Sequence, residues 1–113
     1  MTRRITFKGG WWADLRTAWP YGSDTKIAGA WAFVDDNDKF QAACLLTLSE
    51  SIIAAHVPDI DGNALPFEPD MWSVVDGKIA RHLLKLARDA WAKWQEDIDP
   101  KDTSATSDAS PQE

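Results

Sequence analysis

The chain has 113 residues, of which 44% are hydrophobic, and a formal net charge of −6 with a pI near 4.8. This length supports one core rather than two, and no segment reaches the roughly 18 apolar residues that a membrane span needs. Composition therefore favours a protein of the cytoplasm that is neither secreted nor in a membrane. Seven tryptophans, which bury roughly 200 Å² each, can stabilise so short a chain. The single cysteine, Cys44, is expected to be a buried hydrophobe in a reducing compartment.

Residues 4–16 carry the signals of a β-hairpin. Ile5 and Phe7 alternate with polar residues before Gly9-Gly10, and apolar residues then resume. After a break at Trp19-Pro20-Tyr21-Gly22, a short helix capped by Ser23 or Asp24 is predicted to run to about Val34. Its inner face would carry Ile27, Ala30, Trp31 and Val34.

A long apolar helix is predicted from Asp38, its N-cap, to Val57. Helical spacing leaves a narrow polar strip of Thr47, Glu50 and Ser51, so this helix should be covered on two or three sides. The predicted core face carries Phe40, Cys44, Leu45, Leu48, Ile52 and His56.

A proline-rich loop follows, and Pro69 suits the first residue of a short helix through Val75. The last helix is predicted from Lys78 to about Asp97, with a wide apolar stripe that includes Leu83, Ala87 and Trp94. The expected fold is therefore mainly α: an N-terminal hairpin, then three to four helices, in a single domain of residues 1–97. Residues 98–113 are polar and acidic, and we expect a disordered tail that can be removed without loss of stability.

Charge is unevenly distributed along the chain. Residues 24–76 carry ten acidic residues against two lysines, whereas residues 78–96 carry five basic residues against two acids. This pattern leaves two explanations open for the last helix: a solvated face, or a contact surface for an acidic partner. On the second explanation the basic row lies beside apolar side chains, and the candidate partner-binding residues are Arg81, Leu84, Lys85, Arg88 and Trp91.

Other candidate sites are weaker. The clusters Asp35-Asp36-Asn37-Asp38 and Asp59 to Asn63 lack the ligand spacing of a calcium loop. His56 with Asp59 and Asp61 is a possible mononuclear metal cluster without ligand-type spacing. Basic residues flank Trp11 and Trp12, as in proteins that stack nucleic acid bases, but the acidic pI disfavours phosphate binding. No catalytic motif is recognised, so we expect no enzyme activity, no cofactor and no bound metal.

In its order of elements the chain resembles the tail assembly chaperones of long-tailed bacteriophages, particularly those infecting actinobacteria. The similarity includes the hairpin segment GGWWADLR, the apolar central helix, the proline-rich link with a short helix before an Asp, and the closing helix with a polar tail. It spans roughly residues 5–97. The family has no catalytic residues to carry over, and this chain differs from it in its tryptophan content and in the segment WPYGSD.

The resemblance implies a non-virion protein of the host cell cytoplasm that keeps the apolar, helical tape measure protein soluble while the tail tube protein polymerises around it. Self-association or partner binding through the last helix is expected. Two alternatives from other classes of protein remain. One is a virion head-to-tail joining or minor tail structural protein, and the other is a small enzyme or a nucleic-acid-binding regulator. The resemblance also implies a longer frameshifted form, and codon degeneracy allows Asp99-Pro100-Lys101 to be encoded by a slippery sequence.

Overall fold

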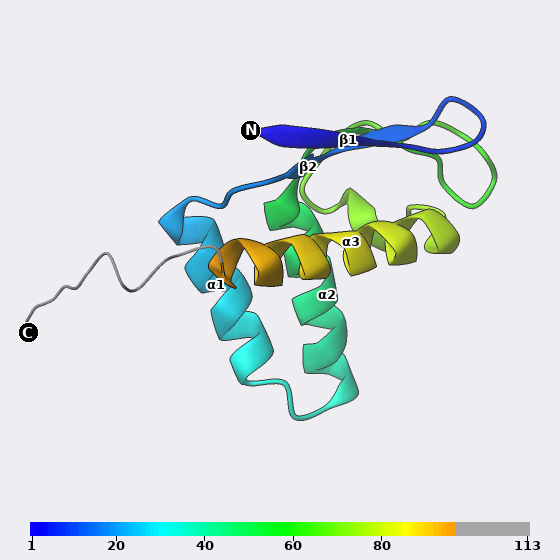
Figure 1. The fold of residues 1–113 in the computed structure, drawn as a ribbon. Coiled ribbons are helices and arrows are strands. Elements are labelled where there is room, and N and C mark those ends of the chain that lie inside the picture. Colours follow the sequence, from blue (N-terminus) through cyan, green and yellow to red (C-terminus); the bar gives the residue numbers. More distant parts are fainter. Residues whose placement is uncertain (97–113) are drawn as a thin grey trace, which may run out of the picture.

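A three-stranded antiparallel sheet and three α-helices make up residues 1–96, the part of the chain that the computed structural model describes (Figure 1). The strands lie in the order β1-β2-β3. Along the chain the elements are β1 (Thr2–Thr6), β2 (Trp12–Arg16), α1 (Tyr21–Ala32), α2 (Asn37–Ser51), β3 (Ile52–His56), the 3-10 helix η1 (Met71–Ser73) and α3 (Gly77–Glu96).

This architecture is not mainly α, so the predicted fold class is wrong. Helices take 52% and strands 20% of the described residues, and the third strand completes a sheet onto which a helix packs. The error lies in the segment that was assigned to the end of the central helix. The tail, residues 98–113, and the Asp99 to Lys101 segment lie outside the described residues, as does Asp97.

The N-terminal hairpin is confirmed. β1 and β2 pair from Thr2 with Arg16 to Thr6 with Trp12, and the amide of Phe7 donates to the carbonyl of Trp11 at 2.8 Å. Gly9 and Gly10 have φ angles of 94° and 85°, which L side chains rarely adopt. The two glycines therefore make the tight reversal between the strands.

The central helix ends at Ser51, and the chain continues directly into a strand. The amide of Ile52 donates to the carbonyl of Leu48, after which β3 runs antiparallel to β2, with Trp12 opposite His56. Ile52 and Ile53 are β-branched and suit a pleated strand, and β2 offers an edge whose backbone groups need partners. Pairing with β2 therefore prevails over continuation of the helix.

The face of α2 that is buried also differs from the prediction. Thr47 and Ser51, expected on the polar strip, are fully buried, whereas Phe40 and Leu45 are 40% and 37% exposed. The reason is that two tryptophans supply hydrogen-bond donors to the buried hydroxyls. The indole of Trp31 in α1 donates to Thr47 Oγ1 at 2.9 Å, and that of Trp19 donates to Ser51 Oγ at 3.2 Å.

Three helix boundaries are corrected as well. α1 begins at Tyr21 after Pro20, not at a Ser23 or Asp24 cap, and it ends at Ala32. The N-cap of α2 is Asp36, whose carboxylate accepts from the amide of Lys39 at 2.8 Å, and not Asp38. The short helix expected from Pro69 to Val75 is reduced to η1.

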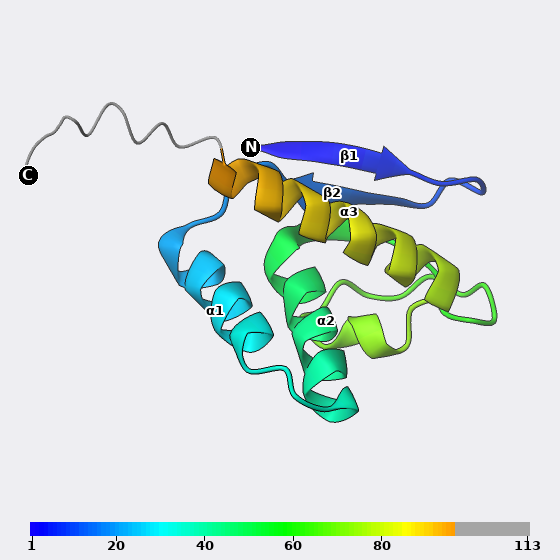
Figure 2. The same ribbon diagram turned by 60° about the horizontal axis from the view of Figure 1, so that its bottom comes forward.

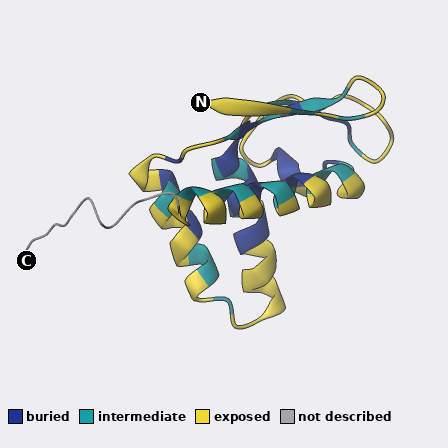
Figure 3. Cartoon of the chain, in the orientation of Figure 1, coloured by how far each residue is buried: buried dark blue, intermediate teal, exposed yellow. Residues whose placement is uncertain are grey.

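The last helix is confirmed within the described residues. Asp76 Oδ1 accepts from the amide of Lys78 at 2.9 Å and so caps α3, while Leu83 and Ala87 are completely buried. Figure 2 shows α3 running alongside β1 and β2, with α1 and α2 extending away as an antiparallel pair. The buried residues gather where α2, α3 and the sheet meet, and the distant ends of α1 and α2 are largely exposed (Figure 3). In residues 1–96 no helix has the length and apolar character to cross a membrane.

Candidate partner-binding groove

The five candidate residues of the last helix line a single groove. Their spacing along α3 places them on one side of the helix, and the groove that they line has a volume of about 620 Å³. We call it the basic groove; its walls are Trp31, Arg81, Leu84, Lys85, Arg88, Asp89, Trp91 and Ala92.

Trp31, from α1, was missed as a member of this site. The Arg88 guanidinium lies over its ring at 4.1 Å from the ring centroid, within the range of a cation–π interaction. The sequence places Trp31 on the inner face of its helix, and no local signal shows that the ring would reach α3. The stack orients Arg88 and leaves the edge of its guanidinium available for hydrogen bonds.

Trp91 fixes the position of α3 against α1. Its indole N–H donates to Asp24 Oδ1 at 2.9 Å, and the amide of Gln95 donates to the same oxygen at 3.4 Å. Trp31 is anchored similarly through Thr47 on α2. Three helices are therefore held in place around the basic groove by the N–H groups of two tryptophans.

Positive charge predominates in the basic groove. Arg81, Lys85 and Arg88 face a single lining carboxylate, Asp89, and within residues 1–96 none of the three forms a salt bridge. A cluster of unpaired positive charges raises the local concentration of an acidic ligand. The groove is thus suited to a partner that carries carboxylates.

A second groove lies beside the first, and its lining is mostly apolar. This apolar groove has a volume of about 550 Å³ between α2, η1 and α3, and it shares Arg81 and Leu84 with the basic groove. Side chains at its opening include the partly exposed Phe40 and Leu45. Its walls are Phe40, Gln41, Cys44, Leu45, Leu48, Trp72, Ser73, Val75, Gly77, Ala80, Arg81 and Leu84.

Two features of the apolar groove bear on chemistry. Cys44 is buried, and burial raises the pKa of its thiol, although the charge of Arg88 acts in the opposite direction. Little nucleophilic thiolate therefore forms near neutral pH.

The indole N–H of Trp72 is buried and has no hydrogen-bond partner among the described residues. Such a donor is costly to leave unpaired, so this wall is less stable than its apolar contacts alone suggest.

The acidic clusters that were considered as metal sites have local structural roles. Asp59 Oδ1 accepts from the amides of Asp61 and Asn63 and so closes a turn, while Asp35 forms an ion pair with Lys39 at 3.0 Å. His56 lies against Trp11, with ring centroids 4.8 Å apart. In residues 1–96 no group of three or more His, Cys, Asp or Glu side chains is placed to hold a metal ion.

The basic residues and tryptophans of the hairpin also contact one another. The Arg4 guanidinium lies 3.8 Å from the centroid of the Trp12 ring and forms two hydrogen bonds with the Asp14 carboxylate, of 2.8 and 3.1 Å. The flat face of the Arg4 guanidinium therefore contacts Trp12, and its edge binds Asp14. Arg4 and Trp12, which belong to the cluster considered for stacking nucleic acid bases, are therefore already in contact with each other within the sheet.

A comparison of the chain with known protein families, with curated proteins and with solved structures finds no match in any of the three.

Proposed function

We propose that this protein is a non-enzymatic phage tail assembly chaperone that binds apolar helical segments of the tape measure protein and keeps them soluble during tail tube assembly. The observation that carries the proposal is that the two grooves are neighbours on α3. Arg81 and Leu84 line both of them, so apolar and cationic surface lie side by side.

Such a surface complements an amphipathic helix. A partner helix can place an apolar stripe against Phe40, Leu45 and Leu84 while its acidic residues reach Lys85 and Arg88. Both grooves are open, and their walls are fixed by contacts between helices, which reduces the ordering cost of binding. The net charge of −6 helps to keep a complex with an apolar partner in solution.

The proposal is tested by co-expression with an apolar helical fragment of the tape measure protein encoded in the same genome. The wild-type chain should keep the fragment in the soluble fraction, and Arg81→Glu combined with Lys85→Glu should not. Both side chains are exposed and form no salt bridge within residues 1–96, so the double variant should remain folded. Leu45→Asp, at the opening of the apolar groove, should also fail to solubilise the fragment.

Lys78→Glu is the control, because it reverses one positive charge on α3, half the charge change of the double variant, at a residue that lines neither groove. It should solubilise the fragment as well as the wild type does. An insoluble fragment beside the wild-type chain would contradict the proposal, as would equal activity of the double variant. Stoichiometric amounts of the protein in purified virions would favour the alternative, a head-to-tail joining or minor tail structural protein.

A further inference from the structure

A separate pocket lies on the other side of α3, where the helix faces the hairpin. It has a volume of about 310 Å³, near the lower end of the range for small-ligand pockets. Residues of β1, β2, the chain after β2, and α3 contribute to it. We call it the sheet–helix pocket; its walls are Arg3, Leu15, Arg16, Thr17, Leu86, Asp89, Ala90, Lys93 and Trp94.

Three cations from three different elements line this pocket. Arg3 comes from β1, Arg16 from β2 and Lys93 from α3, and the one carboxylate in the lining is Asp89. Within residues 1–96 none of the three cations forms a salt bridge. Like charges brought together by folding repel one another, and an anion bound among them relieves that repulsion.

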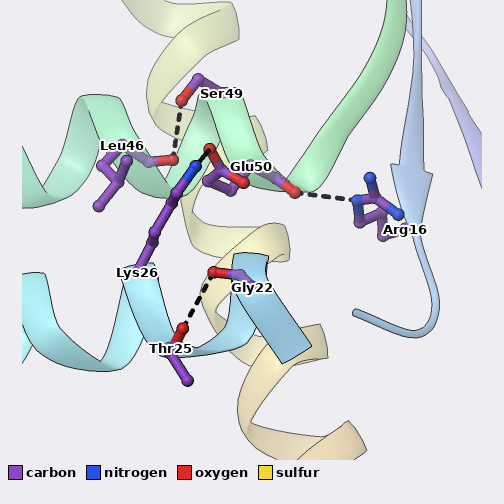
Figure 4. A network of polar contacts seen from close by, with 7 residues as sticks. All are labelled: Arg16, Gly22, Thr25, Lys26, Leu46, Ser49 and Glu50. Atoms are coloured by element: carbon purple, nitrogen blue, oxygen red, sulfur yellow. Dashed lines mark hydrogen bonds and ion pairs between the residues drawn. The ribbon is translucent and has the colours of Figure 1, made fainter. Parts of the chain in front are cut away.

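A hydrogen bond to α2 restricts the side chain of Arg16. It is half-buried, and its Nε donates to the backbone carbonyl of Glu50 at 2.9 Å. Figure 4 shows that its two terminal nitrogens are turned away from this bond. A guanidinium fixed at Nε keeps its terminal N–H groups free to donate to a carboxylate or phosphate oxygen.

Apart from Thr17, the remaining lining of the pocket is apolar, and Leu15 and Trp94 are packed against the core. Leu15 is 1% exposed, and Trp94 packs against the buried ring of Trp19 with ring centroids 5.5 Å apart. Trp19 is itself bonded to Ser51. The pocket therefore combines an apolar wall that does not need to rearrange with a cationic rim.

We propose that the sheet–helix pocket binds a small amphiphilic carboxylate, with its carboxylate between Arg3, Arg16 and Lys93 and its aliphatic or aromatic body against Leu15, Leu86 and Trp94. A purely inorganic anion would leave the apolar wall uncovered, and an uncharged apolar molecule would leave the three cations unpaired. The pocket shares Asp89 with the basic groove and none of the cations or apolar residues to which binding is assigned, so this inference does not rest on the proposed function.

The test is isothermal titration of the full-length chain with three probes. Octanoate supplies both charge and apolar body, octanamide supplies the same body without the charge, and inorganic phosphate supplies charge without the body. Octanoate should bind saturably, and the other two should bind at least about tenfold more weakly. The indole resonance of Trp94 should shift with octanoate in a proton–nitrogen correlation spectrum, which locates the site.

Two variants at exposed positions check the cations without disturbing the core. Arg3→Gln and Lys93→Gln should each weaken octanoate binding by about three- to tenfold, and Lys78→Gln, at the far end of α3 and outside the pocket, should leave it unchanged. The proposal is overturned if octanoate shows no saturable binding at millimolar concentration, or if octanamide or phosphate binds as tightly. Equal weakening by the Lys78→Gln control would also overturn it.

Discussion

The indole N–H of Trp31 on α1 donates a hydrogen bond of 2.9 Å to the hydroxyl of Thr47, which in turn donates to the carbonyl of Ala43 at 2.7 Å within α2. Thr47 is completely buried, so its hydroxyl has been removed from water and needs these partners. The pair joins α1 to α2 and also holds the ring on which Arg88 stacks. One hydroxyl therefore supports both the helix pair and a wall of the basic groove.

Replacing Thr47 with valine should lower the free energy of unfolding by about 1–2 kcal/mol, because Trp31 loses its acceptor while the volume of the side chain is kept. Urea denaturation followed by circular dichroism measures the change. Ser49→Ala is the control, since Ser49 bonds only to the carbonyl of Leu46 in its own helix and is half-buried. It should change stability by less than about 0.5 kcal/mol. Equal losses of unfolding free energy in the two variants would show that the hydrogen bond between Trp31 and Thr47 does not stabilise the fold more than the bond of Ser49 does.

Ile52 and Ile53 provide a direct test of β3. In the strand Ile52 is 1% exposed and Ile53 is 44% exposed, because neighbouring residues point to opposite faces. Ile52→Ala should lower the free energy of unfolding by about 2–4 kcal/mol, and Ile53→Ala by less than about 1 kcal/mol. Chemical denaturation of the two variants measures the difference. Similar losses would contradict the strand and return the segment to a helix with both side chains against the core.

Trp19 and Trp72 are equally buried tryptophans that differ in their hydrogen bonding. The N–H of Trp19 donates to Ser51, whereas the N–H of Trp72 has no partner in the described part of the chain. Trp19→Phe leaves the buried Ser51 without its donor, whereas Trp72→Phe removes an unsatisfied group. Trp19→Phe should therefore cost about 1–2 kcal/mol more in unfolding free energy than Trp72→Phe. Urea unfolding of the two variants measures the difference, and equal costs or the opposite order would contradict this explanation.

The Arg4–Asp14 pair should make stability depend on pH in a defined direction. The hydrogen bonds and charge of Arg4 lower the pKa of Asp14 below its ordinary value of 3.8. The unfolded state therefore binds the proton more readily, so stability rises with pH through this region. The contribution of the pair is complete above about pH 3.8 and is lost as the pH falls through the lower pKa of the folded state.

Asp14→Asn isolates this effect. The stability difference between the wild type and this variant, measured by urea denaturation, should be small because the Arg4 side chain is 54% exposed and water screens the pair. It should also shrink as the pH is lowered below 3.8. A difference that grew on acidification would contradict the assignment of the pKa shift to Arg4.

Elements whose signals are local could be predicted from the order of the residues alone. Gly9 and Gly10 allow the positive φ angles of the hairpin turn, and Asp76 supplies the cap of α3. The spacing of residues 81, 84, 85, 88 and 91 puts five side chains on one side of a helix wherever that helix packs. That is why the α3 half of the candidate site could be described before the fold was known.

The contacts that those elements make with one another depend on long-range packing. The segment from Ile52 to His56 is apolar enough for either a helix or a strand, and the outcome depends on the open edge of β2, which lies 36 residues or more away along the chain. Thr47 and Ser51 read as solvent-facing because buried hydroxyls are costly, yet Trp31 and Trp19 satisfy them across the helix pair. The same long-range packing brings Trp31 to the basic groove. Helical period and turn chemistry are properties of neighbouring residues, whereas strand pairing and the satisfaction of buried polar groups depend on partners that only folding brings together.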